Sequence, residues 1–207
     1  MLNWISLQDN DSYAYREYPL LTENQRVHQA IVPDMSGAVR AGGRCMGCGE
    51  ILDKWAAPPP SLVVKNTKLD ISITYDGIVV GSKRLKSAYD GLGLSGLTFR
   101  GLPGHPSFYM IDADRAVTFD AERRKTRFIK QCPLCGKFES VVGATPVFLR
   151  AGAEVAADEF VRTDLAFGTG DEKHPVLICG ETAGRLCDAK IRGFDLVAIK
   201  DAVVPNH

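Results

Sequence analysis

The sequence predicts an α+β protein built from two similar halves that each contain a β-α-β unit. Two short turns of the form CxxCG, at residues 45–49 and 132–136, match each other. A strand–helix–strand pattern of apolar and polar residues lies downstream of each turn. The chain has 207 residues, of which 45% are hydrophobic, and this is enough for a substantial buried core. We expect one compact unit over residues 1–207.

The two expected halves span about residues 44–104 and 127–201, and a segment of residues 1–43 precedes them. The first β-α-β unit begins with alternating apolar residues from 71 to 75, an Asp76-Gly77 turn and a second strand at 78–80. A strand at 97–102 ends this unit.

A helix is predicted between these strands. Ser82 occupies its N-cap position, because the hydroxyl can accept a hydrogen bond from a free backbone N–H of the first turn. One face of this helix is apolar and comprises Leu85, Ala88, Tyr89 and Leu92.

The C-terminal segment repeats this order of elements. It predicts extended residues 164–167, a turn at 168–171, a strand at 176–178, a helix at 183–190 and a strand at 194–199. An alignment of Val80 with Ile178, followed by a one-residue gap, places Gly96 on Gly193. We interpret this as an internal duplication, and chance similarity between two ordinary β-α-β stretches is the alternative.

The remaining elements are predicted as strands and turns. An early strand is expected near residues 4–7, and the prolines at 58–60 exclude helix and predict a stiff connector. Residues 108–111 and 116–119 are expected to pair as a hairpin. A strand at 127–130 leads directly into the second CxxCG turn.

Charge and hydropathy argue against two classes of protein. The chain carries 25 basic and 25 acidic residues, and zero net charge argues against non-specific binding of nucleic acid. No apolar run approaches the roughly 20 residues of a membrane helix. Residues 1–9 lack the basic start, apolar core and cleavage site of a secretion signal. We therefore expect a soluble, cytoplasmic protein with no membrane partner.

Four of the six cysteines form the two CxxCG turns. In a reducing compartment, such close pairs bind metal more often than they form disulfides. Zinc takes four ligands, and each turn supplies two sulfurs, so the two turns together complete one site. Gly49 and Gly136 allow a positive φ, in which backbone amides point at the sulfurs. We predict one structural Zn²⁺ that joins the two halves and is held by Cys45, Cys48, Cys132 and Cys135.

Redox cycling is the competing interpretation of a CxxC pair, because such a pair at a helix N-terminus alternates between dithiol and disulfide. No amphipathic helix is predicted after either pair, which disfavours redox chemistry. A Cys₄ zinc site is closed and has no position for an activated water. No nucleophile–base set is recognisable elsewhere, so we expect no enzymatic activity.

The other polar and thiol side chains receive structural interpretations. His105 and His174 are predicted in loops, and Cys179 and Cys187 are predicted to be buried free thiols. Local turn hydrogen bonds are expected to satisfy Asp112, Asp114 and Asp120. A solvated basic turn is predicted for Arg123, Arg124, Lys125, Arg127 and Lys130.

The two CxxCG turns, Trp55 with the prolines after it, and the paired segments 70–99 and 164–196 resemble the double-CXXCG motif proteins of myxobacteria and related bacteria. That family looks similar to immunity proteins of polymorphic toxin systems. The resemblance implies zinc at the four motif cysteines and a cognate protein toxin as the partner, and no catalytic residue carries over. The alternative is a zinc-dependent nucleic-acid-binding or regulatory protein, which the neutral net charge disfavours.

Overall fold

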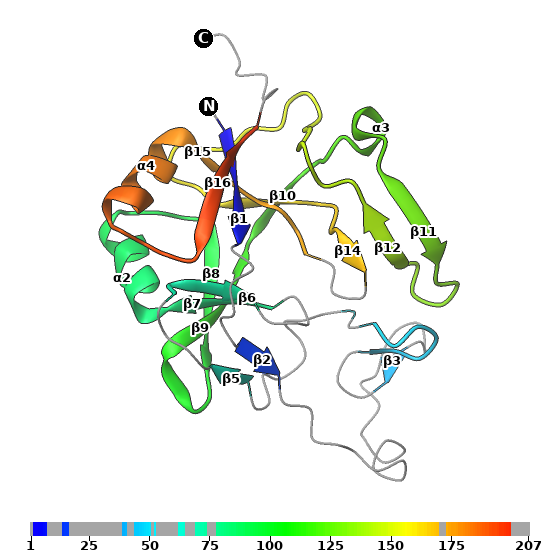
Figure 1. The fold of residues 1–207 in the computed structure, drawn as a ribbon, viewed down its shortest axis with the longest axis horizontal. Helices are drawn as coiled ribbons and strands as arrows, with labels where there is room; N and C mark the ends of the chain where they lie inside the picture. The colour runs from blue at the N-terminus through cyan, green and yellow to red at the C-terminus, as the bar shows by residue number, and fades with distance from the viewer. Residues whose placement is uncertain are drawn as a thin grey trace.

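The computed structural model describes residues 2–7, 14–16, 39–40, 44–50, 52, 62–64, 69–73, 78–169 and 173–199. Within these ranges the fold is α+β, with more strands than helices (Figure 1). The predicted proline connector and the Asp76-Gly77 turn lie outside the described residues. No helix in the described part of the chain is both long and apolar enough to cross a lipid bilayer.

One sheet has four antiparallel strands in the order β6-β7-β9-β8. Its strands are β6 (Ile71–Ile73), β7 (Val79–Ser82), β8 (Leu97–Leu102) and β9 (His105–Ala113). Helix α2 (Lys83–Gly91) links β7 to β8, as the sequence predicts. However, the short turn after β8 folds β9 back between β8 and β7. The predicted β-α-β unit therefore has the right order of elements, but its two strands are not neighbours. His105 begins β9 and is not a loop residue.

A second sheet has five strands in the order β10-β13-β15-β1-β16. Its strands are β1 (Leu2–Leu7), β10 (Arg115–Val117), β13 (Val161–Thr163), β15 (Val176–Cys179) and β16 (Phe194–Ala198). Helix α4 (Gly180–Asp188) links β15 to β16, and β1 lies between these two strands. The early strand is thus present. It comes from the segment that the sequence sets apart from both expected halves.

Two predicted segments differ in the structure. Residues 164–167 are not a strand, and the expected turn at 168–171 begins instead with strand β14 (Gly168–Thr169). The hairpin predicted over 108–119 is also wrong. Because β9 already pairs with β7 and β8, the chain crosses at Asp114 to the other sheet, where β10 pairs in parallel with β13.

A third sheet, in the order β11-β12-β14, carries the second CxxCG turn at the tip of its hairpin. The hairpin strands are β11 (Arg127–Gln131) and β12 (Phe138–Val142), and the short helix α3 (Ala121–Arg124) precedes them. β11 confirms the predicted strand before Cys132. Two short antiparallel pairs are also described: β2 (Ala14–Arg16) with β5 (Leu62–Val64), and β3 (Val39–Arg40) with β4 (Arg44–Cys45).

Helices α2 and α4 contribute to one cluster of buried hydrophobic residues and lie on the same side of the molecule (Figure 1). Leu85 of α2 and Leu186 of α4 are 1% and 0% exposed. The Ser82 hydroxyl accepts a hydrogen bond from the Leu85 N–H at 3.1 Å, which confirms the predicted N-cap. The Cys179 sulfur accepts one from the Thr182 N–H in the same way at the start of α4.

The turns that follow the two helices dock against the opposite sheets. Gly96, after α2, has φ +82° and leaves no room for a side chain beside the Phe160 carbonyl oxygen. Gly193, after α4, has φ +106° and likewise leaves no room for a side chain beside the Ile71 carbonyl oxygen. The Phe160 N–H donates to Ser95 and the Ile71 N–H donates to Arg192, at 2.9 and 3.0 Å.

Cys179 follows Ser82 by the same number of residues as Gly193 follows Gly96. Both helices have nine residues. The predicted alignment of Val80 with Ile178 is therefore one residue out of register. The predicted alignment also placed Asp90 on Asp188, whereas the capping side chains Ser82 and Cys179 fix where each helix begins.

His174 precedes β15 and is half-buried against β13. Its Nδ1–H donates to the Thr163 carbonyl oxygen at 2.7 Å, and the Arg162 guanidinium lies 3.3 Å from the ring. Burial lowers the pKa of His174, and the Arg162 cation lowers it further. The loop position is as predicted, but the ring is a packed and hydrogen-bonded group.

We predict that Gly193→Ala destabilises the protein by about 2–4 kcal/mol, because the added methyl group meets the Ile71 carbonyl and φ is positive. Gly184→Ala, in the interior of α4 with open space around it, is the control and should stabilise by about 0.5–1 kcal/mol. Urea unfolding measures both changes. Wild-type stability for Gly193→Ala would contradict the docking of this turn.

We also predict a loss of stability as the pH falls through and below the ordinary histidine pKa of about 6.5. The unfolded chain then binds a proton that folded His174 resists, so the free energy of unfolding decreases. His174→Gln should flatten this slope. Urea unfolding at a series of pH values tests this, and an unaltered slope in His174→Gln would refute it.

Candidate metal centre

The two CxxCG turns have the same backbone structure. In the first, the Cys45 N–H donates to the Glu50 carbonyl at 2.8 Å and the Gly49 N–H donates to the Cys45 carbonyl at 2.9 Å. In the second, the equivalent bonds run from Cys132 to Lys137 and from Gly136 to Cys132, at 2.7 and 2.9 Å. Gly49 and Gly136 have φ of +79° and +74°, as predicted for this turn.

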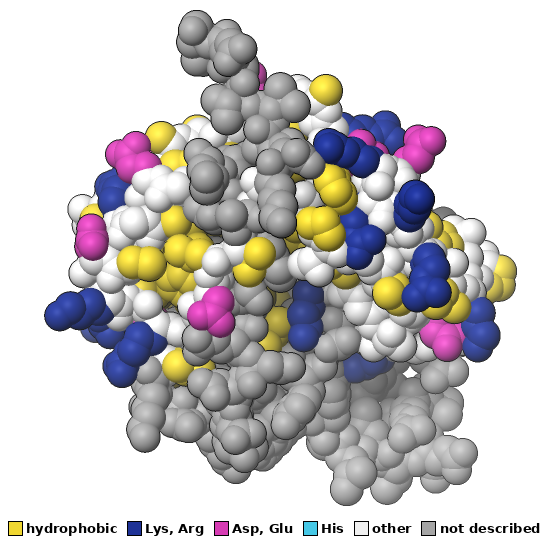
Figure 2. Space-filling model, turned by 45° about the horizontal axis from the view of Figure 1, so that its top comes forward, with side chains coloured by type: hydrophobic (Ala, Val, Ile, Leu, Met, Phe, Trp, Pro, Cys, Tyr) yellow, Lys and Arg dark blue, Asp and Glu magenta, His cyan; other side chains and the backbone are white. Residues whose placement is uncertain are grey.

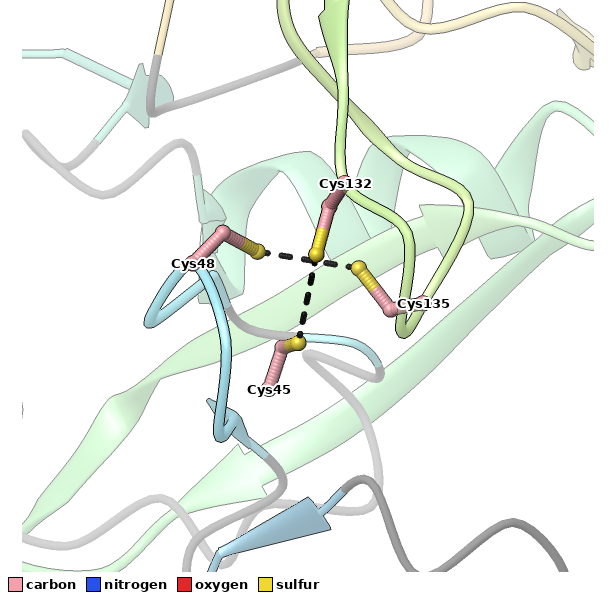
Figure 3. Close-up of side chains that lie close together, drawn as sticks. All are labelled: Cys45, Cys48, Cys132 and Cys135. Carbon is pink, nitrogen blue, oxygen red and sulfur yellow. Dashed lines mark hydrogen bonds between the residues drawn. The ribbon is translucent and has the colours of Figure 1, made fainter.

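The four predicted cysteines come together although 87 residues separate the two turns. All four sulfur atoms lie within 4.8 Å of one another. The Cys45 and Cys132 sulfurs are 3.8 Å apart, and those of Cys48 and Cys135 are 3.6 Å apart. Figure 3 shows the four sulfurs pointing toward a common centre from two facing turns.

These distances fit a tetrahedral metal ion. Four thiolates at about 2.3 Å from one ion would place their sulfurs about 3.8 Å apart. Each sulfur is already at about that distance from one sulfur of the opposite turn. The donor set is entirely sulfur, which zinc and other soft divalent metals accept. The cluster can therefore hold a metal ion.

Two contacts that the sequence did not single out position the turns. The residue before each first cysteine donates to the carbonyl of the turn glycine: Arg44 to Gly49 at 2.9 Å, and Gln131 to Gly136 at 3.0 Å. The sequence did carry a signal for these two contacts: a long side chain that can donate a hydrogen bond stands directly before each CxxCG motif.

The facing turns are also matched in size. A Cβ atom at Gly47 would lie 2.9 Å from the side chain of Leu134, which occupies the equivalent position of the other turn. Gly47 therefore allows the two turns to approach each other.

The thiols differ in acidity within each turn. The backbone N–H groups of Cys135 and Leu134 lower the pKa of Cys132 to about 6. Burial raises the pKa of Cys135 to about 12, and the neighbouring thiols raise it further. In the first turn, the backbone N–H of Cys48 lowers the pKa of Cys45, and burial raises the pKa of Cys48. Amides thus favour a thiolate at the first position of each turn.

The cluster lies at the rim of the molecule. Cys45 and Cys132 are buried, at 1% and 8% exposure, while Cys135 is half-buried and Cys48 is exposed. The buried hydrophobic cluster to which α2 and α4 contribute contains none of these cysteines. A metal ion held by this cluster would therefore fasten the tip of the β11–β12 hairpin to the segment around β4.

The other candidate residues do not form a second centre within the described ranges. The four cysteines are the one group of His, Cys, Asp and Glu side chains placed to hold a metal there. Cys179 is half-buried and Cys187 is exposed, so the prediction of two buried thiols is wrong. Cys179 is the N-cap of α4, so its sulfur lies beside the Thr182 N–H in the first turn of the helix. Asp120 caps α3, and Asp114 accepts a hydrogen bond from Thr98 at 2.5 Å.

No protein-family model matches the chain, and no curated protein matches its sequence.

We predict that Cys132→Ser lowers the metal content of the purified protein and destabilises the fold by about 3 kcal/mol or more. It removes a buried thiol of the second turn whose sulfur lies 3.8 Å from that of Cys45 in the first turn. Cys187→Ser, at an exposed position of α4, is the control and should retain both metal and stability. Elemental analysis and thermal melting measure the two properties. Full metal content in Cys132→Ser would remove this residue from the ligand set.

Proposed function

We propose that Cys45, Cys48, Cys132 and Cys135 hold one structural Zn²⁺ in a non-enzymatic cytoplasmic protein. In this proposal the protein binds a cognate protein toxin and neutralises it, as an immunity protein does. The observation that carries the proposal is the convergence of four thiols from two matched turns within 4.8 Å.

Zinc is supported by the donor chemistry. A set of four sulfurs suits a soft tetrahedral ion, and the reducing cytoplasm keeps cysteines as thiols. When bound, the ion neutralises the thiolates and links the two turns. Since all four positions of such an ion are taken by protein sulfur, no position is left for substrate or an activated water.

A binding role is supported by two further features. In the part of the chain that the structure describes, no second group of His, Cys, Asp or Glu side chains is placed to hold a metal ion. The CxxCG turns and the segments paired with them resemble the double-CXXCG motif proteins, which look similar to immunity proteins. The first feature disfavours an active site, and the second points to a toxin as partner.

Co-expression tests the toxin-binding role. The gene should protect a bacterial host from a toxin encoded beside it, and the two purified proteins should form a stable complex. The Cys132→Ser variant should protect less well than Cys187→Ser. Survival of the host without this gene, while the toxin is active, would count against the proposal.

Binding of nucleic acid is the second candidate. It is favoured by the basic side chains of β11, which is the first strand of the hairpin with the second CxxCG turn, and of α3, which precedes that hairpin. A titration with DNA and with RNA at two salt concentrations distinguishes the candidates. Steep weakening with salt would favour nucleic acid, because binding to phosphates releases counterions.

We further propose that the two halves, each with a CxxCG turn and a strand–helix–strand unit, arose by duplication and that the metal ion joins them at these turns. Support comes from the matched N-caps, the equal helix lengths and the reciprocal contacts of Gly96 and Gly193. Gly96→Ala should then destabilise the protein about as strongly as Gly193→Ala. A large difference in the free energy of unfolding between the two variants would argue against equivalent roles.

A further inference from the structure

Exposed large hydrophobic residues concentrate on one part of the molecule. Among the described residues, all but Val197 of this class lie on the β11–β12 hairpin or on the CxxCG turns. These residues are Met46, Phe128, Ile129, Leu134 and Val142. Scattered exposed hydrophobics need no explanation, but a concentration beside one structural element marks an interaction site. We call β11 together with these side chains the hairpin surface.

β11 is an edge strand within the described sheet. It pairs with β12 on one side and stands at the end of the order β11-β12-β14. All five of its residues are exposed. Backbone N–H and C=O groups along the other edge of such a strand can pair with an added strand. In Figure 1, β11 runs along the outer right-hand side of the molecule.

The surroundings of this edge are basic. Residues 121–131 contain five basic side chains and one acidic side chain, whereas the whole chain is neutral. Lys130 pairs with Glu139 at 2.9 Å, and both side chains remain largely exposed. Basic and hydrophobic side chains lie intermingled on the right-hand part of the surface in Figure 2. Such a surface complements an acidic segment that also carries apolar residues.

We propose that the outer edge of β11 is a docking site for an extended, acidic segment of a protein partner. The segment adds a strand to the β11-β12-β14 sheet. Its apolar side chains contact Phe128 and Ile129, which lie on opposite faces of the sheet, and its carboxylates lie beside Arg127 and Lys130. Because the partner is the toxin of the proposed function, this inference names the binding surface and rests on that function.

The metal centre contributes to this site by ordering it. Cys132 directly follows β11, and the hairpin tip is fastened to the first CxxCG turn through the four sulfurs. A strand that is already held in position loses less conformational freedom on binding. Loss of metal should therefore weaken docking even though no ligand atom touches the partner.

A short synthetic peptide that repeats two glutamates and two valines is the probe, because both faces of such a strand carry glutamate and valine. A peptide of the same pattern with lysine in place of glutamate is its counterpart. The full-length zinc-loaded protein is titrated with each peptide while backbone amide NMR shifts are recorded. The acidic peptide should shift β11 amides, and Ile129→Asp or Arg127→Glu should weaken binding by about tenfold. Val197→Asp is the control for Ile129→Asp, because both side chains are 41% exposed. Lys83→Glu is the control for Arg127→Glu. Both controls should bind as the wild type does.

Several outcomes would overturn the inference. They are no shift with the acidic peptide, equal binding of both peptides, or wild-type binding by Ile129→Asp. Tighter binding of single-stranded RNA than of the acidic peptide at the same amides would assign the surface to nucleic acid instead. Metal content and thermal melting verify that each variant is folded.

The toxin assay separates this inference from the proposed function. Peptide binding at β11 without protection from the toxin would contradict the immunity role and leave the docking site standing. Protection that Ile129→Asp does not reduce would leave the immunity role standing and remove β11 as its surface.

Discussion

The structure depends on bringing two matched turns together from positions 87 residues apart. Closing so long a loop is entropically unfavourable in the unfolded chain, and a metal ion bound at both ends offsets that cost. The turns themselves need little help, since each is fixed by two backbone hydrogen bonds and a glycine with positive φ. The tertiary fold has to supply their encounter, which Gly47 permits by leaving room for Leu134.

The cysteine cluster and the hydrophobic core lie in different parts of the molecule. The cluster around Leu85 and Leu186 joins the two helix-bearing sheets. The cysteine cluster lies apart from it and joins the tip of the β11–β12 hairpin to the first CxxCG turn. β12 is anchored in a second buried cluster through Val141, whereas every residue of β11 is exposed. The outer strand β11 therefore depends on its pairing with β12 and on the turn that follows it. A metal clamp at the tip of the hairpin is suited to keep this strand ordered at the surface.

The helix termini show how local chemistry and packing combine. Ser82 and Cys179 each accept a hydrogen bond from the first turn of a helix, although cysteine is a weak acceptor. Each helix is followed by a turn whose glycine lies against a carbonyl of the opposite sheet. These glycines are required by a contact between segments far apart in sequence, and not by the helix end alone.

The sequence by itself determined the local features: the two CxxCG turns, the capped helix after Ser82, and most of the strands. These follow from residue type and spacing over a few positions. Only the tertiary structure decided which strands are neighbours, because pairing depends on segments distant in sequence. Thus β1 and β9 enter between strands that the sequence placed side by side, and β10 joins a different sheet from β9. Likewise, spacing singled out the four cysteines that come together, whereas their position at the rim rather than in the core followed from how the hairpin packs.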